Sequence, residues 1–219
     1  MRLGSLAPLL SAPLVWRSLA ALGAVLVVAG LSLAAASPTD LRSADERNHT
    51  GQLLVASPTM GDSNFEQTVI LMIAHDTSGA MGLVVNRQMG VRPLREILES
   101  FNDADSGAQG DIPVHFGGPV ELGRGFVLHS PDYVGDTTLV VSHHAALTSS
   151  VEVLRALGEG TGPRHGFVAF GYAGWAPGQL EAEIAEDAWV IVPADEKLIF
   201  GHDNAGKWDR AISKRGIDL

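Results

Sequence analysis

The stretch Gly171-Tyr-Ala-Gly-Trp-Ala-Pro-Gly-Gln-Leu-Glu-Ala-Glu-Ile184, followed by Asp187-Ala-Trp-Val-Ile-Val-Pro193, decides the local architecture of this chain. Its glycines and proline predict a tight turn between a strand over Gly166–Gly171 and a helix over Pro177–Ala185. The apolar run Trp189–Val192 then predicts another strand. We expect Trp175 to anchor the turn by packing into the core.

The rest of the chain mixes strands and helices without a repeated βαβ period. Continuous apolar, β-branched runs predict strands that are buried on both faces. Helical spacing of apolar residues, with Pro93 at the first helical position, predicts the helices. The predicted strands are Gln52–Ser57, Thr68–Ala74, Ala80–Asn86, Val114–Phe116, Gly125–His129 and Thr138–Val141, with a hairpin connection at His75–Gly79; the predicted helices are Leu94–Phe101, Leu147–Leu157 and Lys207–Ser213. This irregular order favours an α+β fold.

The charge of the 219-residue chain is unevenly distributed. Residues 1–50 carry four arginines and three acidic residues, whereas residues 51–219 carry eleven basic and twenty-two acidic residues. A domain with this balance repels phosphate backbones unless its few cations share one face. The chain has no cysteine, which excludes disulfides, thiol nucleophiles and cysteine-based zinc sites.

The first fifty residues differ from the rest. Residues 19–36 are uncharged and apolar, two arginines precede them, and Ala34-Ala-Ala36 resembles a signal-peptidase site. This pattern predicts that residues 1–36 form a signal peptide or a membrane anchor. The arginines on its N-terminal side then place the following residues across the membrane. A mis-assigned translation start is the alternative. Residues 37–50 predict a polar linker, and residues 51–219 predict the folded domain.

An ordered series of short motifs spans the predicted domain. The series begins with Gly51-Gln-Leu-Leu-Val-Ala-Ser-Pro58 and Gly79-Ala-Met-Gly-Leu-Val-Val-Asn86. It continues with Gly117-Gly-Pro119, Arg124-Gly-Phe-Val-Leu-His129, and the Gly171–Glu181 segment. In this order the motifs resemble the YqgE/AlgH family of bacterial proteins. The resemblance implies an α+β domain with a bifurcated mixed β-sheet that includes a small barrel and is surrounded by helices. It carries over no established catalytic or binding residue, and family members are sometimes labelled putative transcriptional regulators.

Two glycine-containing segments are candidate ligand sites. Gly174, Trp175 and Gly178 lie at the start of a predicted helix, whose N-terminal amide groups can hold an anion. Gly117, Gly118 and Arg124 lie in a glycine-rich segment where Arg124 can bind a carboxylate or a phosphate. The alternative for both is structural: a tight turn in the first case, and in the second a hairpin whose Arg124 is solvated or paired with Glu121.

Signatures of catalysis are weak. The chain has eight histidines, of which His75, His115 and His129 lie at or in predicted strands and are the candidates for a metal site. It contains no His-Glu-x-x-His, Gly-x-Ser-x-Gly, Walker or dinucleotide-binding pattern. Glu181 and Glu183 lie two apart on a predicted helix and do not face each other. We expect neither a metal nor a cofactor, and no catalytic residue is assigned.

The best candidate for a nucleic-acid surface is the C-terminal helix. Lys207, Arg210 and Lys214 have helical spacing, and Trp208 with Ile212 is expected to face the core. A solvated helix face is the simpler interpretation, so we do not expect nucleic-acid binding. The sequence therefore predicts a non-enzymatic domain that binds a protein or small molecule in the bacterial envelope. The alternatives are a cytoplasmic transcriptional regulator and a hydrolase or metal enzyme that uses the histidines.

Overall fold

The computed structural model describes residues 48–101, 103 and 108–216. The predicted signal or anchor segment, residues 1–36, and residues 37–47 of the predicted linker lie outside these residues. None of the helices in the described ranges combines the length and the apolar composition needed to cross a membrane.

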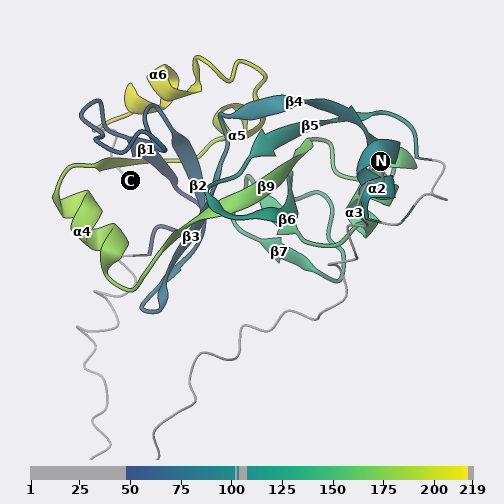
Figure 1. The fold of residues 1–219 in the computed structure, drawn as a ribbon, viewed down its shortest axis with the longest axis horizontal. Coiled ribbons are helices and arrows are strands. Elements are labelled where there is room, and N and C mark those ends of the chain that lie inside the picture. Colours follow the sequence, from purple (N-terminus) through teal and green to yellow (C-terminus); the bar gives the residue numbers. More distant parts are fainter. Residues whose placement is uncertain (1–47, 102, 104–107, 217–219) are drawn as a thin grey trace, which may run out of the picture.

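Strands dominate the described part of the chain, and five helices cover the sheet (Figure 1). The strands are β1 (Leu53–Ala56), β2 (Val69–Asp76), β3 (Gly79–Val84), β4 (Gln88–Pro93), β5 (Asp111–Phe116), β6 (Val120–His129), β7 (Thr138–Val140), β8 (Ala146–Thr148), β9 (Gly166–Trp175) and β10 (Trp189–Val192). The helices are α2 (Leu94–Ser100), α3 (Glu152–Gly158), α4 (Gln179–Ala185), α5 (Glu196–Phe200) and α6 (Lys207–Ile212). The main path of the sheet is β10-β1-β2-β3-β9-β6-β8-β7, and the α+β class is confirmed.

The sheet branches at β9. The end of this strand, Ala173–Trp175, pairs antiparallel with β3, whereas Val168–Phe170 pairs in parallel with β5. Strand β6 pairs antiparallel with β9, and β4 extends the branch beyond β5. This arrangement is the predicted bifurcated mixed sheet. Figure 1 shows β9 passing from the β1–β3 part of the molecule into the curled part formed by β4–β8.

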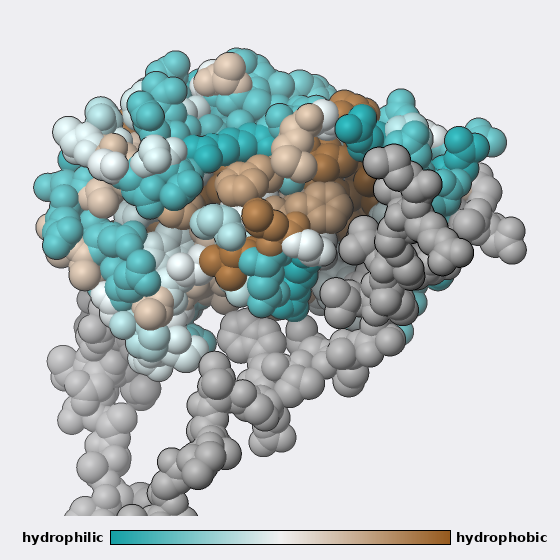
Figure 2. Space-filling model, in the orientation of Figure 1, coloured by the Kyte–Doolittle hydropathy of each residue, from teal (hydrophilic) through white to brown (hydrophobic). Residues whose placement is uncertain are grey.

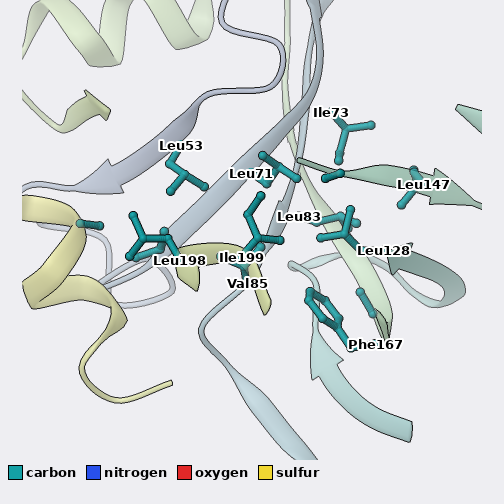
Figure 3. Close-up of a cluster of buried hydrophobic side chains, with 14 of the residues drawn as sticks. Leu53, Leu71, Ile73, Leu83, Val85, Leu128, Leu147, Phe167, Leu198 and Ile199 are labelled. Atoms are coloured by element: carbon teal, nitrogen blue, oxygen red, sulfur yellow. The ribbon is translucent and has the colours of Figure 1, made fainter. Parts of the chain in front are cut away.

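Three apolar clusters hold the layers together. In β2, Leu71 and Ile73 face a cluster that includes Leu198 and Ile199 of α5, while Ile70 and Met72 face a second cluster under α4. This alternation explains why the run Thr68–Ala74 is apolar throughout, since both faces of the strand are covered. A third cluster packs α2 and α3 against β5, β6 and β9. Figure 3 shows part of the first cluster, with Val85 and Ile199 close to Leu71.

Several predicted boundaries are wrong. Leu147 belongs to strand β8, and the helix that was predicted to begin there begins at Glu152. Strand β9 continues to Trp175, so the turn is shorter than predicted and α4 begins at Gln179 rather than at Pro177. Strand β4 and helix α5 were not predicted. Asp195 caps α5 by accepting a hydrogen bond from the Leu198 amide at 2.8 Å, which is the usual polar start of a helix.

Candidate functional site

Gly117 and Gly118 lie where the sheet branches. The Gly117 amide donates to the Phe170 carbonyl at 2.8 Å, and its own carbonyl accepts from the Val84 amide at 2.9 Å. A Cβ atom on Gly118 would lie 2.1 Å from the carbonyl carbon of Tyr172. Both glycines are buried. They join the two branches through close backbone packing, and this structural role requires the absence of a side chain.

Arg124 lies in the exposed part of β6. Its guanidinium donates to the Glu121 carboxylate at 3.1 Å and lies 5.0 Å from the centre of the Phe126 ring. The side chain is 46% exposed, so the ion pair contributes little to stability. The pairing of Arg124 with Glu121 matches the structural alternative, but the predicted hairpin is wrong, because β5 and β6 each pair with β9 and not with each other.

Trp175 and Trp189 share one acceptor on α4. Their indole N–H groups donate to the same oxygen of Glu183 at 2.9 and 2.7 Å. Glu181, two positions earlier, instead contacts His75 at 3.3 Å. The two carboxylates therefore point to different partners, as their spacing predicted. Glu183 is a structural acceptor that fixes the orientation of both buried indoles.

Gly174 and Gly178 flank this cluster and are exposed. Gly178 has a φ of 76°, in the left-handed region, and precedes α4 as its N-cap residue. A Cβ atom there would meet no neighbouring atom, so backbone conformation alone favours glycine. At Gly174 a Cβ atom would lie 3.2 Å from the Tyr172 ring. Neither residue contacts the cavity described below.

The three candidate metal-binding histidines have separate environments. His129 uses both ring nitrogens, which lie 2.8 Å from the Ser130 carbonyl and 2.8 Å from the Thr148 hydroxyl. His75 is held between the His49 amide and Glu181. Within the residues that the structure describes, no three His, Asp or Glu side chains are placed to hold a metal ion.

The predicted basic face of the C-terminal helix is not formed as expected. Lys207 is 1% exposed and lies in the core, so its predicted place on a solvated face is wrong. Its ammonium group donates to the carbonyl oxygens of Val85 and Ile199, each at 2.8 Å. Arg210 is paired with Asp203, and Lys214 with Asp195. The nucleic-acid surface that was considered for this helix, and not expected, therefore lacks its first cation, and Arg210 and Lys214 are paired with carboxylates.

Lys207 lines a cavity of about 160 Å³, which we call the Lys207 cavity. The cavity lies between β5, the start of β9 and the segment from α5 to α6. Its lining residues are Gln88, Pro113, His115, Arg164, His165, Gly166, Phe167, Ile199, Phe200, Gly201, His202, Asn204 and Lys207. A single water molecule needs only about 10–15 Å³ on the same measure, so the cavity has room for a small ligand.

Two residues that line this cavity carry a buried polar atom without a hydrogen-bond partner among the described residues. His115 is 3% exposed, and its Nδ1 atom has no hydrogen-bond partner among the described residues. The Oδ1 atom of Asn204 is likewise buried and unpartnered in that part of the chain, although its Nδ2 donates to Gln88 at 2.8 Å. Unpaired buried polar atoms cost about 1–3 kcal/mol each. A bound group that pairs with them would remove this cost.

Burial shifts the pKa values of two residues that line the cavity, His115 and Lys207. Desolvation and, secondarily, the positive charge of Lys207 lower the pKa of His115 to about 3, so the imidazole is neutral at pH 7. The His115 ring is stacked on Phe167, with 4.0 Å between ring centres. Desolvation also lowers the pKa of Lys207 to about 8. Lys207 therefore remains an ammonium ion at neutral pH.

A second hollow is smaller and apolar. It lies between β6 and α3, has a volume of about 20 Å³, and is lined mainly by apolar side chains that include Phe101, Phe126 and Leu154. This space accommodates roughly one water molecule. Figure 2 shows that apolar side chains gather near the middle of the visible face, between hydrophilic regions. The Lys207 cavity is the larger and more polar of the two.

The fold and this site define a class: an α+β domain with a branched sheet and a partly polar cavity beside its C-terminal helices. A family model described as AlgH-like, DUF179, matches residues 53–219. The chain belongs to this family.

The relatives agree with this assignment. A UPF0301 protein of Rhodopseudomonas palustris is 46% identical over 176 residues, which cover 77% of this chain and 81% of the relative. A UPF0301 protein of Methylococcus capsulatus is 45% identical over 170 residues, covering 78% and 93%. The solution structure of AlgH from Pseudomonas aeruginosa has a TM-score of 0.65 and 38% identity, covering 79% of this chain and 92% of that one. A Corynebacterium diphtheriae protein at 20% identity, with a TM-score of 0.60 and coverage of 77% and 88%, shows the same fold.

The structure brings together residues that the sequence did not connect. His115 was considered only as a metal ligand, and Lys207 only as a surface cation. Asn204 was not singled out. One sequence feature is consistent with the burial of Lys207. Ala211 follows four residues later on the same helix face, and the structure buries it fully.

Proposed function

We propose that this AlgH-like protein is a non-enzymatic domain that binds a small ligand in the Lys207 cavity. The observation that carries the proposal is that two residues lining a cavity of about 160 Å³, His115 and Asn204, each hold a buried atom, Nδ1 and Oδ1, without a partner in the described part of the chain. Buried polar atoms in folded proteins are almost always paired with protein, water or ligand. A ligand that pairs with both atoms would complete the site.

The non-enzymatic part of the proposal is supported by the engagement of two candidate acid–base groups, Glu183 and His129. Glu183 accepts from two indoles, and both ring nitrogens of His129 have partners. These groups are occupied by structural hydrogen bonds.

The proposal also places the protein on, or exported through, the bacterial inner membrane, because residues 19–36 are uniformly apolar and follow two arginines.

Ligand-observed NMR with the full-length protein tests the binding function. The probes are small acids, amides and alcohols added separately to the wild type, to His115→Phe and to a control, His143→Phe, at an exposed position. We expect at least one chemical class to bind the wild type and the control but not His115→Phe. Binding that His115→Phe retains in full for every class would refute the assignment of the cavity as the site.

Cell fractionation together with sequencing of the mature N-terminus tests the localisation. A mature chain that starts near Ser37, or a full-length chain in the membrane fraction, is the expected result. A soluble cytosolic chain that starts near Gln52 would overturn this part of the proposal and leave the cavity unaffected.

A further inference from the structure

The ammonium group of Lys207 has no carboxylate partner within the described ranges, although it is buried. It donates hydrogen bonds to the neutral carbonyl oxygens of Val85 and Ile199. An ammonium has three donors, so one N–H bond remains for another acceptor. Isolated buried charges cost several kcal/mol, and proteins normally compensate them with an opposite charge.

The carboxylates that act on Lys207 or contact the cavity lining are paired with other groups. Asp203, whose charge acts on Lys207, pairs with the Arg210 guanidinium through Oδ2 and accepts a hydrogen bond from the Gly206 amide through Oδ1. Glu196 lies 3.1 Å from His165 at the edge of the cavity, and Asp132 binds Arg164 at 2.8 Å. Among the described residues, no aspartate or glutamate lines the Lys207 cavity, whereas its ionisable lining residues are a lysine, an arginine and three histidines. This lining is basic even though the domain as a whole is acidic.

We propose that the Lys207 cavity binds a small oxyanion, with the ammonium group of Lys207 supplying the opposite charge; this inference rests on the proposed ligand-binding function. The oxygens of the oxyanion accept a hydrogen bond from the remaining N–H of Lys207. They accept another from the Nδ1–H of His115, in the tautomer whose Nδ1 carries the proton. Charge-assisted hydrogen bonds of this kind are roughly twice as strong as neutral ones. The anion removes both the unpaired charge and the unpaired imidazole nitrogen.

Asn204 narrows the chemical class of the ligand further. Its buried Oδ1 accepts hydrogen bonds only, so it requires a donor from the ligand. An oxyanion that also carries a hydroxyl group meets both requirements: a short hydroxycarboxylate and a monohydrogen or dihydrogen phosphate share this chemistry. Phe167 and Phe200 supply apolar walls, which suits a small organic acid as well as an inorganic ion.

The test is an NMR titration of the full-length protein with three separate probes at constant ionic strength. The probes are glycolate, inorganic phosphate and glycolamide, which is the neutral counterpart of glycolate. The signals followed are the ring proton between the two nitrogens of His115 and the ε-methylene protons of Lys207. We expect saturable shifts of both signals with glycolate, with phosphate, or with both, and weaker binding of glycolamide by about tenfold or more, because a charge-assisted bond contributes about 1.5–3 kcal/mol.

Lys207→Met and Lys214→Met form the matched pair of variants. Lys214 is paired with Asp195 and does not line the cavity, so its variant should retain the anion affinity. Lys207→Met should lose about tenfold or more in affinity. If Lys207→Met does not fold, the wild-type comparison of glycolate with glycolamide still decides the question.

The outcomes separate this inference from the proposed function. Equal or tighter binding of glycolamide would refute the oxyanion while leaving a ligand-binding cavity. Shifts of exposed residues alone, without saturation at His115 and Lys207, would also refute it. The absence of any shift with all three probes, together with no binding in the ligand-observed experiment, would overturn both proposals.

Discussion

Lys207 and Val85 lie 122 positions apart in the sequence, yet the Lys207 ammonium donates to the Val85 carbonyl oxygen at 2.8 Å. This bond links the C-terminal helix α6 to the residue that directly follows strand β3. The same nitrogen holds the carbonyl of Ile199 at the end of α5. Lys207 thus connects three segments of the fold and also lines the cavity.

Substitution of Lys207 by methionine should destabilise the protein. Methionine fills a similar volume but leaves two buried carbonyl oxygens without a donor, so we expect a loss of about 1–3 kcal/mol in the free energy of unfolding. Urea denaturation measures this loss. Lys214→Met, whose lysine pairs with Asp195 near the surface, should change stability by less than about 1 kcal/mol. A Lys207→Met variant as stable as the wild type would show that relief of the buried charge offsets the lost hydrogen bonds.

The neutral His115 should make the protein sensitive to acid. Its pKa is about 3 in the folded protein, below the usual 6.5, so between these values the unfolded chain binds a proton that the folded protein does not. Stability from this group is complete above pH 6.5 and is lost progressively as the pH falls towards 3. His115→Phe should therefore flatten the decline in stability between pH 6.5 and 4.5. The measurement is urea denaturation across this range.

The exposed His143→Phe is the control for that pH profile. Its curve should follow the wild type. Parallel acid profiles for wild type and His115→Phe would contradict a buried, neutral imidazole at position 115.

Glu183→Ala should weaken the packing of both tryptophans. It removes the shared acceptor of Trp175 and Trp189, and we expect a loss of about 2–4 kcal/mol because two largely buried indole N–H groups become unpaired. Tryptophan fluorescence during urea unfolding reports both the stability and the indole environment. Glu181→Ala, on the same helix but bonded to His75, should cost less. Equal losses for the two variants would argue against a special role of Glu183.

Gly171→Ala should be more damaging than Gly178→Ala. Both glycines have left-handed φ angles, 73° and 76°, which cost about 1–2 kcal/mol for other residues. At Gly171 the new Cβ atom would also lie 2.3 Å from the Gly118 carbonyl oxygen, whereas at Gly178 it would meet no atom. Thermal unfolding of the two variants compares these costs directly. A similar melting temperature for both would mean that the branch point relaxes without penalty.

The sequence pattern predicted strands correctly where every side chain of a short run is buried. The run Thr68–Ala74 is apolar because β2 is covered on both faces, and this predicts a strand without knowledge of its neighbours. Leu147 was misassigned to a helix because its spacing to Val151 and Leu154 mimics a helical stripe. Pairing of Leu147 with Leu128 and Leu139 in neighbouring strands overrides that local pattern.

The candidate site was harder to predict. The segments that carry Gln88, His115, Asn204 and Lys207 come together only through tertiary contacts, and a lysine in a terminal helix is normally solvated. Conversely, Gly117 and Gly118 had the composition of a ligand loop, but their function in the structure is close packing at the branch of the sheet. Composition alone does not distinguish these two uses of glycine.

The most direct test of the ligand-binding account is a pair of crystal structures of the full-length protein, grown in the presence of glycolate and, separately, of inorganic phosphate. The account predicts that at least one of the two anions occupies the Lys207 cavity, with its charged oxygens within hydrogen-bond distance of Lys207 Nζ and His115 Nδ1 and its hydroxyl group on Asn204 Oδ1. A cavity that contains only ordered water in both structures, which satisfies His115 and Asn204 while both anions are absent or bound elsewhere, would contradict it.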